Sequence, residues 1–257
     1  MADQAFAIYR IVVQAAGGTS RIVPLRDYTH DLDAILEAIT PATRLVFLAN
    51  PNNPTGTVFF RREWEDFLSA VPPHVIVVMD EAYFEFVEDP AYPDSLATHG
   101  KARALITLRT FSKIYGLAGL RIGFGVAHPA LIEMMNRVRQ PFNVNSLAQI
   151  AALAALDDDE HVTRTKQCNR EGMAYVRQQC TRLGLEYVPS WANFLLIRVG
   201  NGKRVYEALL REGVIVRPMN VYGFAEHVRV TIGTAEENTR FVNAIEHILQ
   251  AGGASAA

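Results

Sequence analysis

Four short apolar runs, separated mostly by helical patterns, limit what the first half of this chain can fold into. The runs cover residues 44–49, 75–79, 104–108 and 121–127. Apolar runs of this length, bounded by proline or polar residues, are typical of strands buried on both faces. Helical patterns cover residues 31–39, 61–70 and 129–138. Strands that alternate with helices favour βαβ units, so we predict an α/β fold with a mostly parallel sheet flanked by helices.

The pattern changes after residue 145. Helices are predicted at 146–156, 158–183, 202–212 and 234–250, and strands at 192–199, 214–217 and 227–231. Gly184 is expected to end the long helix, and Thr234 with Glu237 forms a capping-box pattern at the start of the last one. We therefore predict a large domain over 1–145 and a smaller α+β C-terminal domain over 146–257.

Charge and composition exclude several classes of protein. The formal net charge of −2 gives no electrostatic basis for binding nucleic acid or an anionic membrane. No apolar stretch approaches the roughly 18–20 residues that a membrane-spanning helix needs. The seven histidines and two cysteines lack metal-ligand spacing, so no metal site is expected. The first residues do not form a signal-peptide pattern, and we expect a cytoplasmic protein.

Polar segments follow three of the predicted strands. They are the turn at 50–56, the carboxylate of Asp80, and the segment 110–113, which contains Lys113, one of only four lysines. Open α/β sheets bind ligands beyond the carboxyl ends of their strands, so these segments are expected at one edge. The structural alternatives are a plain connecting turn, a helix N-cap by Asp80 and a solvated lysine.

Arg229 lies inside the apolar run 228–232, where a guanidinium needs an anionic partner. A substrate carboxylate could bind it through two hydrogen bonds, and an internal acidic residue is the alternative.

One ligand would satisfy all the segments at the strand ends. It needs an aldehyde, a phosphate, a basic ring nitrogen and a ring oxygen, and pyridoxal phosphate has all four. The matching side chains are Lys113 for the aldehyde, Thr110, Ser112 and Arg121 for the phosphate, Asp80 for the nitrogen, and Asn53 and Tyr83 for the oxygen.

These motifs, in this order and spacing, resemble those of the fold-type I aminotransferases of class I and II, most closely the histidinol-phosphate branch. The segments that carry the resemblance are 52–56, 80–83, 110–113, 119–123, 141–146, 193–195, 216–218 and Arg229. The resemblance implies transamination with pyridoxal 5'-phosphate. Histidinol phosphate and 2-oxoglutarate would give imidazole-acetol phosphate and glutamate, a step of histidine biosynthesis, in a homodimer.

The resemblance also implies a role for each site residue. Lys113 would carry the cofactor and move the substrate proton, which makes it the catalytic residue. Asp80 would keep the ring nitrogen protonated. The remaining roles are stacking on the ring by Phe6, tuning of the ring oxygen by Asn53 and Tyr83, phosphate binding by Thr110, Ser112 and Arg121, carboxylate binding by Arg229, and contact with the substrate's phosphate by Arg217.

Three alternatives remain open. Within the same fold, the chain could be an aromatic-amino-acid aminotransferase or a decarboxylase of a phosphorylated amino acid. Members of the resembled family carry roughly 100 further residues before the point that matches Phe6. We therefore expect the site to lack an N-terminal arm and a glycine-containing loop. The alternative of another class is an inactive fragment or a non-catalytic binding partner.

Overall fold

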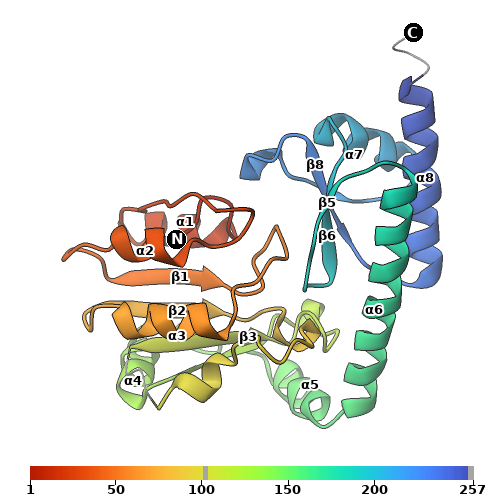
Figure 1. Ribbon diagram of the computed structural model, residues 1–257. Coiled ribbons are helices and arrows are strands. Elements are labelled where there is room, and N and C mark those ends of the chain that lie inside the picture. Colours follow the sequence, from red (N-terminus) through yellow and green to blue (C-terminus); the bar gives the residue numbers. More distant parts are fainter. Residues whose placement is uncertain (101–103, 254–257) are drawn as a thin grey trace.

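The computed structural model describes residues 1–100 and 104–253, and they form two separate four-stranded sheets (Figure 1). The first sheet has the order β1-β2-β3-β4, with β1 at Leu45–Ala49, β2 at Ile76–Asp80, β3 at Leu105–Thr110 and β4 at Gly123–Ala127. The second has the order β5-β6-β8-β7, with β5 at Tyr187–Val188, β6 at Phe194–Arg198, β7 at Arg217–Pro218 and β8 at His227–Thr231.

The first sheet is mostly parallel, which confirms the predicted fold class. β1 pairs with β2 and β2 with β3 in parallel, and β4 is antiparallel to β3. In this register Ala49 lies opposite Asp80, and Asp80 lies opposite Leu108. The carboxyl ends of three strands therefore meet at one edge, where the polar segments begin.

Helices cover both faces of this sheet. On one face, α2 (Leu32–Glu37) and α3 (Arg61–Ala70) bury apolar side chains against β1, β2 and β3. The core of this layer consists mainly of Leu32, Ile35, Val46, Leu48, Trp64, Phe67, Val77, Met79 and Leu105. On the other face, α1 (Ile8–Ala15) packs Tyr9 against Phe47 and Ala49. The helix α4 (Pro129–Val138) follows β4, and three short 3-10 helices occupy Phe84–Phe86, Ser95–Thr98 and Ala118–Leu120.

The second sheet packs against three helices. After α5 (Ser146–Leu156) comes the 24-residue α6 (Asp159–Arg182), which runs beside α8 (Ala235–Gly253) in Figure 1. These two helices and α7 (Gly202–Arg211) bury Met173, Val176, Leu209, Phe241 and Ile245 against β6 and β8. The opposite face of β6 turns toward the first sheet, because Phe194 packs edge-on against Tyr83 at a ring-centroid distance of 5.1 Å.

Two predicted helix boundaries are confirmed by their capping geometry. Gly184 follows α6 with a φ of 68°, the left-handed conformation that glycine adopts without strain. Before α8, the Thr234 N–H donates to Glu237 Oε2 at 2.8 Å, and the Glu237 N–H donates to Thr234 Oγ1 at 3.3 Å. Each side chain satisfies a backbone N–H that the helix leaves unpaired.

Two expectations for the elements need correction. The strand predicted at 214–217 is shorter and begins later, because only Arg217 and Pro218 pair with β8. The N–H of Val214 instead donates to Leu209 O at 2.9 Å, so this part of the segment caps the end of α7. The helix α1 was not predicted from the sequence. The proposed domain boundary between residues 145 and 146 stays a prediction. Within the described ranges, no helix combines the length and apolarity that crossing a membrane requires.

His30 gives the fold a testable dependence on pH. Its side chain is 4% exposed, its Nε2 accepts the Ala49 N–H at 3.4 Å, and its Nδ1 has no hydrogen-bond partner among the described residues. Burial lowers the pKa of this imidazole from 6.5 to about 4. Between these values the unfolded chain binds a proton that the folded chain does not, so stability falls as pH falls.

We expect the free energy of unfolding to lose about 1.4 kcal/mol from this group for each pH unit between 6.5 and 4. Urea unfolding of the wild type and His30→Gln across this range measures the loss. The variant keeps an acceptor near Ala49 but cannot titrate, so its stability should fall less steeply. Parallel pH profiles would show that His30 is not buried in its neutral form.

Candidate functional site

A cavity of about 590 Å³ lies at the carboxyl edge of the first sheet. The ends of β1, β2 and β3 contribute Ala49, Asp80 and Thr110 to its wall, and Gly123 of β4 adds a further side. All the residues predicted to bind the cofactor line this one cavity, namely Phe6, Asn53, Asp80, Tyr83, Thr110, Ser112, Lys113 and Arg121. Their convergence follows from the parallel register, which sets three strand ends side by side.

Asp80 is held in place by two hydrogen bonds. Its Oδ2 accepts the hydroxyl of Tyr9 at 2.6 Å, and its Oδ1 accepts the N–H of Ala82 at 3.1 Å. Burial raises the pKa of this carboxyl, while the two hydrogen bonds and the charge of Lys113 oppose the rise. A carboxylate has about four acceptor positions, so two remain available for a cationic ligand.

Lys113 lies on the loop that follows β3 and is partly buried. Burial lowers the pKa of its amine, the positive charges of Arg229 and Arg121 lower it further, and Asp80 opposes them. Its Nζ lies 5.1 Å from the centroid of the Tyr83 ring. A lysine with a lowered pKa is neutral more often, and the neutral amine is the form that attacks an aldehyde.

The loop around Lys113 offers hydroxyl and guanidinium donors. Thr110 Oγ1 accepts the Ser112 N–H at 3.0 Å, which sets a tight turn before the lysine. Arg121 adopts the left-handed backbone conformation with a φ of 55°, and its Nη1 donates to Ala118 O at 2.7 Å. Two hydroxyls and a guanidinium lining one cavity are suited to hold a phosphate.

Tyr83 and Asn53 connect this cavity to the second sheet. Tyr83 is buried against Phe194, and burial raises the pKa of its phenol to about 12. Asn53 Oδ1 accepts a hydrogen bond from Arg229 Nη1. Arg229 therefore reaches from β8 to the turn after β1.

Arg229 and Arg217 face each other across β7 and β8 and line a second hollow of about 390 Å³. The guanidinium of Arg229 lies 4.8 Å from the centroid of the Phe194 ring, and its Nε is buried with no hydrogen-bond partner. Over residues 1–100 and 104–253 neither arginine forms an ion pair, which removes the internal partner weighed for Arg229. Paired arginines without a carboxylate favour an anionic ligand.

A partly buried network of ion pairs adjoins the site. Arg109 donates from Nε to Glu81 Oε2 at 3.0 Å and from Nη2 to Asp94 Oδ1 at 2.8 Å. Glu81, which is 1% exposed, also accepts the Ser95 N–H at 3.0 Å. Because Glu81 and Arg109 directly adjoin Asp80 and Thr110, the network fixes the strand ends on which those residues lie.

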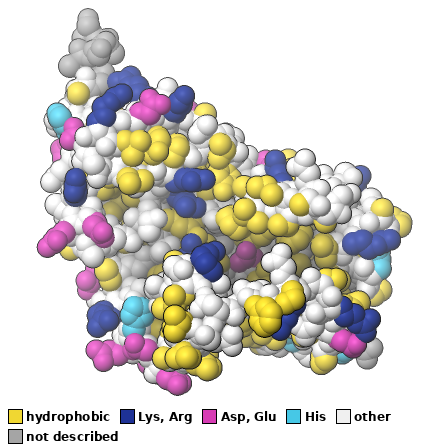
Figure 2. Space-filling model, turned by 180° about the vertical axis from the view of Figure 1, so that it is seen from behind, with side chains coloured by type: hydrophobic (Ala, Val, Ile, Leu, Met, Phe, Trp, Pro, Cys, Tyr) yellow, Lys and Arg dark blue, Asp and Glu magenta, His cyan; other side chains and the backbone are white. Residues whose placement is uncertain are grey.

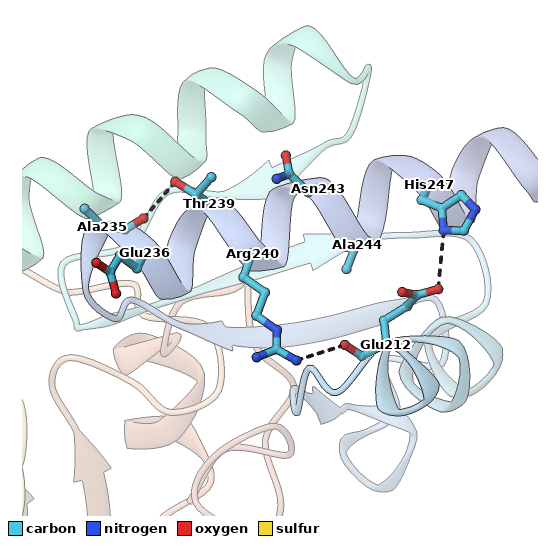
Figure 3. A pocket seen from close by; sticks show the side chains of 8 residues that line it. All are labelled: Glu212, Ala235, Glu236, Thr239, Arg240, Asn243, Ala244 and His247. Atoms are coloured by element: carbon cyan, nitrogen blue, oxygen red, sulfur yellow. Dashed lines mark hydrogen bonds and ion pairs between the residues drawn. The ribbon is translucent and has the colours of Figure 1, made fainter.

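Another hollow, of about 690 Å³, lies between α7 and α8 (Figure 3). Two of its side chains interact with Glu212 at the end of α7. Arg240 donates to the backbone carbonyl of Glu212 at 3.3 Å, and His247 Nδ1 lies 3.3 Å from its carboxylate. None of the predicted site residues lines this hollow, so it is not the candidate site.

Tyr9 was not predicted as a site residue, although it lines the cavity and its hydroxyl donates a hydrogen bond to Asp80. Its position three residues after Phe6 would have placed both rings on one face of a helix, had a helix been predicted there. Glu81 was likewise not singled out, although it directly follows Asp80.

The family model for class I and II aminotransferases matches residues 1–245. The match covers almost the whole chain. It includes the residues that line the cavity: its lysine, its carboxylate and the hydrogen-bond donors suited to a phosphate. The chain therefore belongs to the class I and II aminotransferase family.

Within that family the chain is similar to histidinol-phosphate aminotransferases. It is 54% identical over 246 residues to histidinol-phosphate aminotransferase 1 of Nitrosococcus oceani, covering 95% of this chain and 66% of that protein. It is 52% identical to histidinol-phosphate aminotransferase 2 of Ralstonia nicotianae, covering 99% and 69%. The chain thus spans about two thirds of the length of these curated relatives.

A solved structure has the same fold. The histidinol-phosphate aminotransferase of Sinorhizobium meliloti, in complex with pyridoxal-5'-phosphate, superposes with a TM-score of 0.88 at 27% identity. The similarity covers 96% of this chain and 69% of that one.

Proposed function

We propose that this chain belongs to an enzyme that transfers an amino group from histidinol phosphate to 2-oxoglutarate, with pyridoxal 5'-phosphate as its cofactor. The products would be imidazole-acetol phosphate and glutamate. The observation that carries this proposal is that an amine, a carboxylate and hydrogen-bond donors suited to a phosphate line one cavity. Identities of 54% and 52% to histidinol-phosphate aminotransferases support the choice of substrate.

The residues present fit the cofactor. The cavity of about 590 Å³ is within the range typical of small-molecule sites. Lys113 supplies an amine whose pKa is lowered, and Asp80 retains free acceptor positions for a protonated ring nitrogen. Thr110, Ser112 and Arg121 supply donors for a phosphate.

When bound, pyridoxal phosphate supplies an aldehyde that reacts with amines and a protonated ring that withdraws electrons. Lys113 Nζ would hold the cofactor covalently until the substrate's amine replaces it. The freed Nζ would then take the proton from the amino-bearing carbon of the substrate. Asp80 would keep the proton on the ring nitrogen.

The other side chains would orient the reactants. Phe6 would stack on the ring, Asn53 and Tyr83 would bind the ring oxygen, and Thr110, Ser112 and Arg121 would bind the phosphate. Arg229 would bind the carboxylate of glutamate or 2-oxoglutarate, since its Nε has no partner. Arg217, in the same hollow, would contact the phosphate of histidinol phosphate.

Exposed apolar side chains on α5 support a homodimer. The helix α5 is apolar on nearly all sides, and its side chains Leu147, Ile150, Leu153 and Leu156 are at least half exposed. Figure 2 shows broad areas of hydrophobic side chains on one face of the molecule. Exposed apolar surface of this extent marks an interaction surface, and a second copy of the chain is the partner we propose.

Attachment of the cofactor tests the proposed function directly. We expect the protein mixed with pyridoxal phosphate to show a near-visible absorption band that bleaches when glutamate is added. Lys113→Ala should lose the band, while the matched control Lys203→Ala, an exposed lysine on α7, should keep it. After borohydride reduction, mass spectrometry should find the cofactor on Lys113. A band that survives in Lys113→Ala would refute the assignment, and no band in any protein would support the incomplete-fragment alternative.

Substitution of Arg229 and of Arg217 should affect the KM values of the two substrates differently. We expect Arg229→Ala to raise the KM for glutamate about 10- to 100-fold, because a hydrogen-bonded ion contact is worth roughly 1.5–3 kcal/mol. Arg217→Ala should raise the KM for histidinol phosphate more than that for glutamate. Steady-state kinetics of both half-reactions, with the exposed Arg211→Ala as control, measures this difference. Equal effects of both substitutions on both substrates would contradict these roles.

A change of charge on α5 tests the dimer. Sedimentation should give the wild type twice the chain mass of 28.5 kDa. Leu153→Glu, at a side chain that is 68% exposed, should shift the equilibrium toward the monomer without loss of fold. The matched Leu210→Glu on α7 should leave the mass unchanged. A monomeric wild type would rule the dimer out.

A further inference from the structure

We propose that Tyr9 is a positioning residue for the cofactor's ring nitrogen. Its hydroxyl fixes the orientation of the Asp80 carboxylate and keeps that carboxylate ionised. This inference rests on the proposed function, because it concerns how the same cavity holds a protonated ring.

The hydrogen bond is short and protected from water. Tyr9 Oη lies 2.6 Å from Asp80 Oδ2, in the range of a hydrogen bond to a charged oxygen. The Tyr9 side chain is 5% exposed, and the two residues are 71 positions apart in the chain. A buried tyrosine hydroxyl generally finds a partner, and this one has the carboxylate at the base of the cavity.

The ring of Tyr9 cannot move away without disrupting the packing on that face of the sheet. It stacks on Phe47 at a centroid distance of 5.1 Å and an interplanar angle of 17°. The Phe6 ring meets it edge-on at 5.7 Å and 87°. Ala2, Ala5 and Ala49 complete the buried cluster. This packing therefore fixes the direction from which the Tyr9 hydroxyl donates its hydrogen bond to Asp80.

Tyr9 acts as a donor only. Burial raises the pKa of its phenol well above the usual range, and the charge of Asp80 adds to this effect. The proton of the hydrogen bond therefore stays on the tyrosine and the negative charge stays on Asp80. This matters because burial alone would drive Asp80 toward its neutral form, in which it could not hold a cation.

The other groups around Asp80 do not replace this hydrogen bond. The Ala82 N–H binds Oδ1, the opposite oxygen. Lys113 also opposes protonation of Asp80 by its charge, but its amine would be consumed when it bonds to the cofactor. Tyr83 lines the same cavity, but the side-chain hydrogen bonds of Asp80 go to Tyr9 and Ala82 instead. With Lys113 bonded to the cofactor, Tyr9 and Ala82 would be the protein groups that still donate hydrogen bonds to Asp80.

Tyr9→Phe tests the role of the hydroxyl because it retains the ring and its packing. The matched control is Tyr92→Phe, which removes another buried hydroxyl, one that donates to the backbone carbonyl of Asn50 instead of to Asp80. In the cofactor-free protein, carbon-13 NMR of the aspartate carboxyls, with Asp80→Asn to assign the signal, reports the pKa of Asp80. We expect Tyr9→Phe to raise this pKa by roughly one to two units and Tyr92→Phe to leave it unchanged.

The loaded protein provides a second readout. With cofactor labelled with nitrogen-15 in its ring, NMR should show the ring nitrogen of Tyr9→Phe losing its proton at least one pH unit lower than in the wild type. The kcat should fall about tenfold or more with little change in KM. Unchanged profiles of both Asp80 and the ring nitrogen in Tyr9→Phe would overturn this inference alone. A wild type that does not attach the cofactor through Lys113 would overturn the proposed function and this inference together.

Discussion

The parallel hydrogen-bond ladder that joins β1, β2 and β3 is the constraint on which the candidate site depends. It sets Ala49, Asp80 and Leu108 in one row, so that the chain leaves three strands at the same edge of the sheet. A slip of one residue between β2 and β3 would turn Asp80 toward the apolar layer beneath α2 and α3. Burial of Val77 and Met79 in that layer therefore also determines which way the carboxylate points.

The second sheet contributes a positive charge, that of Arg229, to the surroundings of the cavity at the edge of the first sheet. Arg229 extends from β8 to Asn53, and its charge lowers the pKa of Lys113. Asp80 has the opposite effect on the pKa of the lysine, so charges from both sheets influence this amine. The chemistry of Lys113 thus depends on how closely the two sheets are held, and the contact between Tyr83 and Phe194 is one of the packings that hold them.

The sequence was sufficient for features set by local pattern and insufficient for contacts between distant segments. The four strands of the first sheet follow apolar runs, so their ends, and with them Asp80 and Lys113, were predictable to within one or two residues. The helix α1 was not, because its sequence IYRIVVQA is rich in β-branched residues, which favour strands. The bonds Tyr9–Asp80 and Arg229–Asn53 join residues 71 and 176 positions apart, and no local pattern reports such pairings.

Arg121 combines two requirements that conflict. Its backbone is left-handed, with a φ of 55°, a conformation that costs an ordinary residue roughly 1–2 kcal/mol and glycine almost nothing. Arg121 also lines the cavity that contains Lys113. The backbone at position 121 therefore favours glycine or asparagine, whereas the proposed binding of a phosphate favours arginine. An arginine at this position indicates that ligand binding outweighs the conformational stability of the loop.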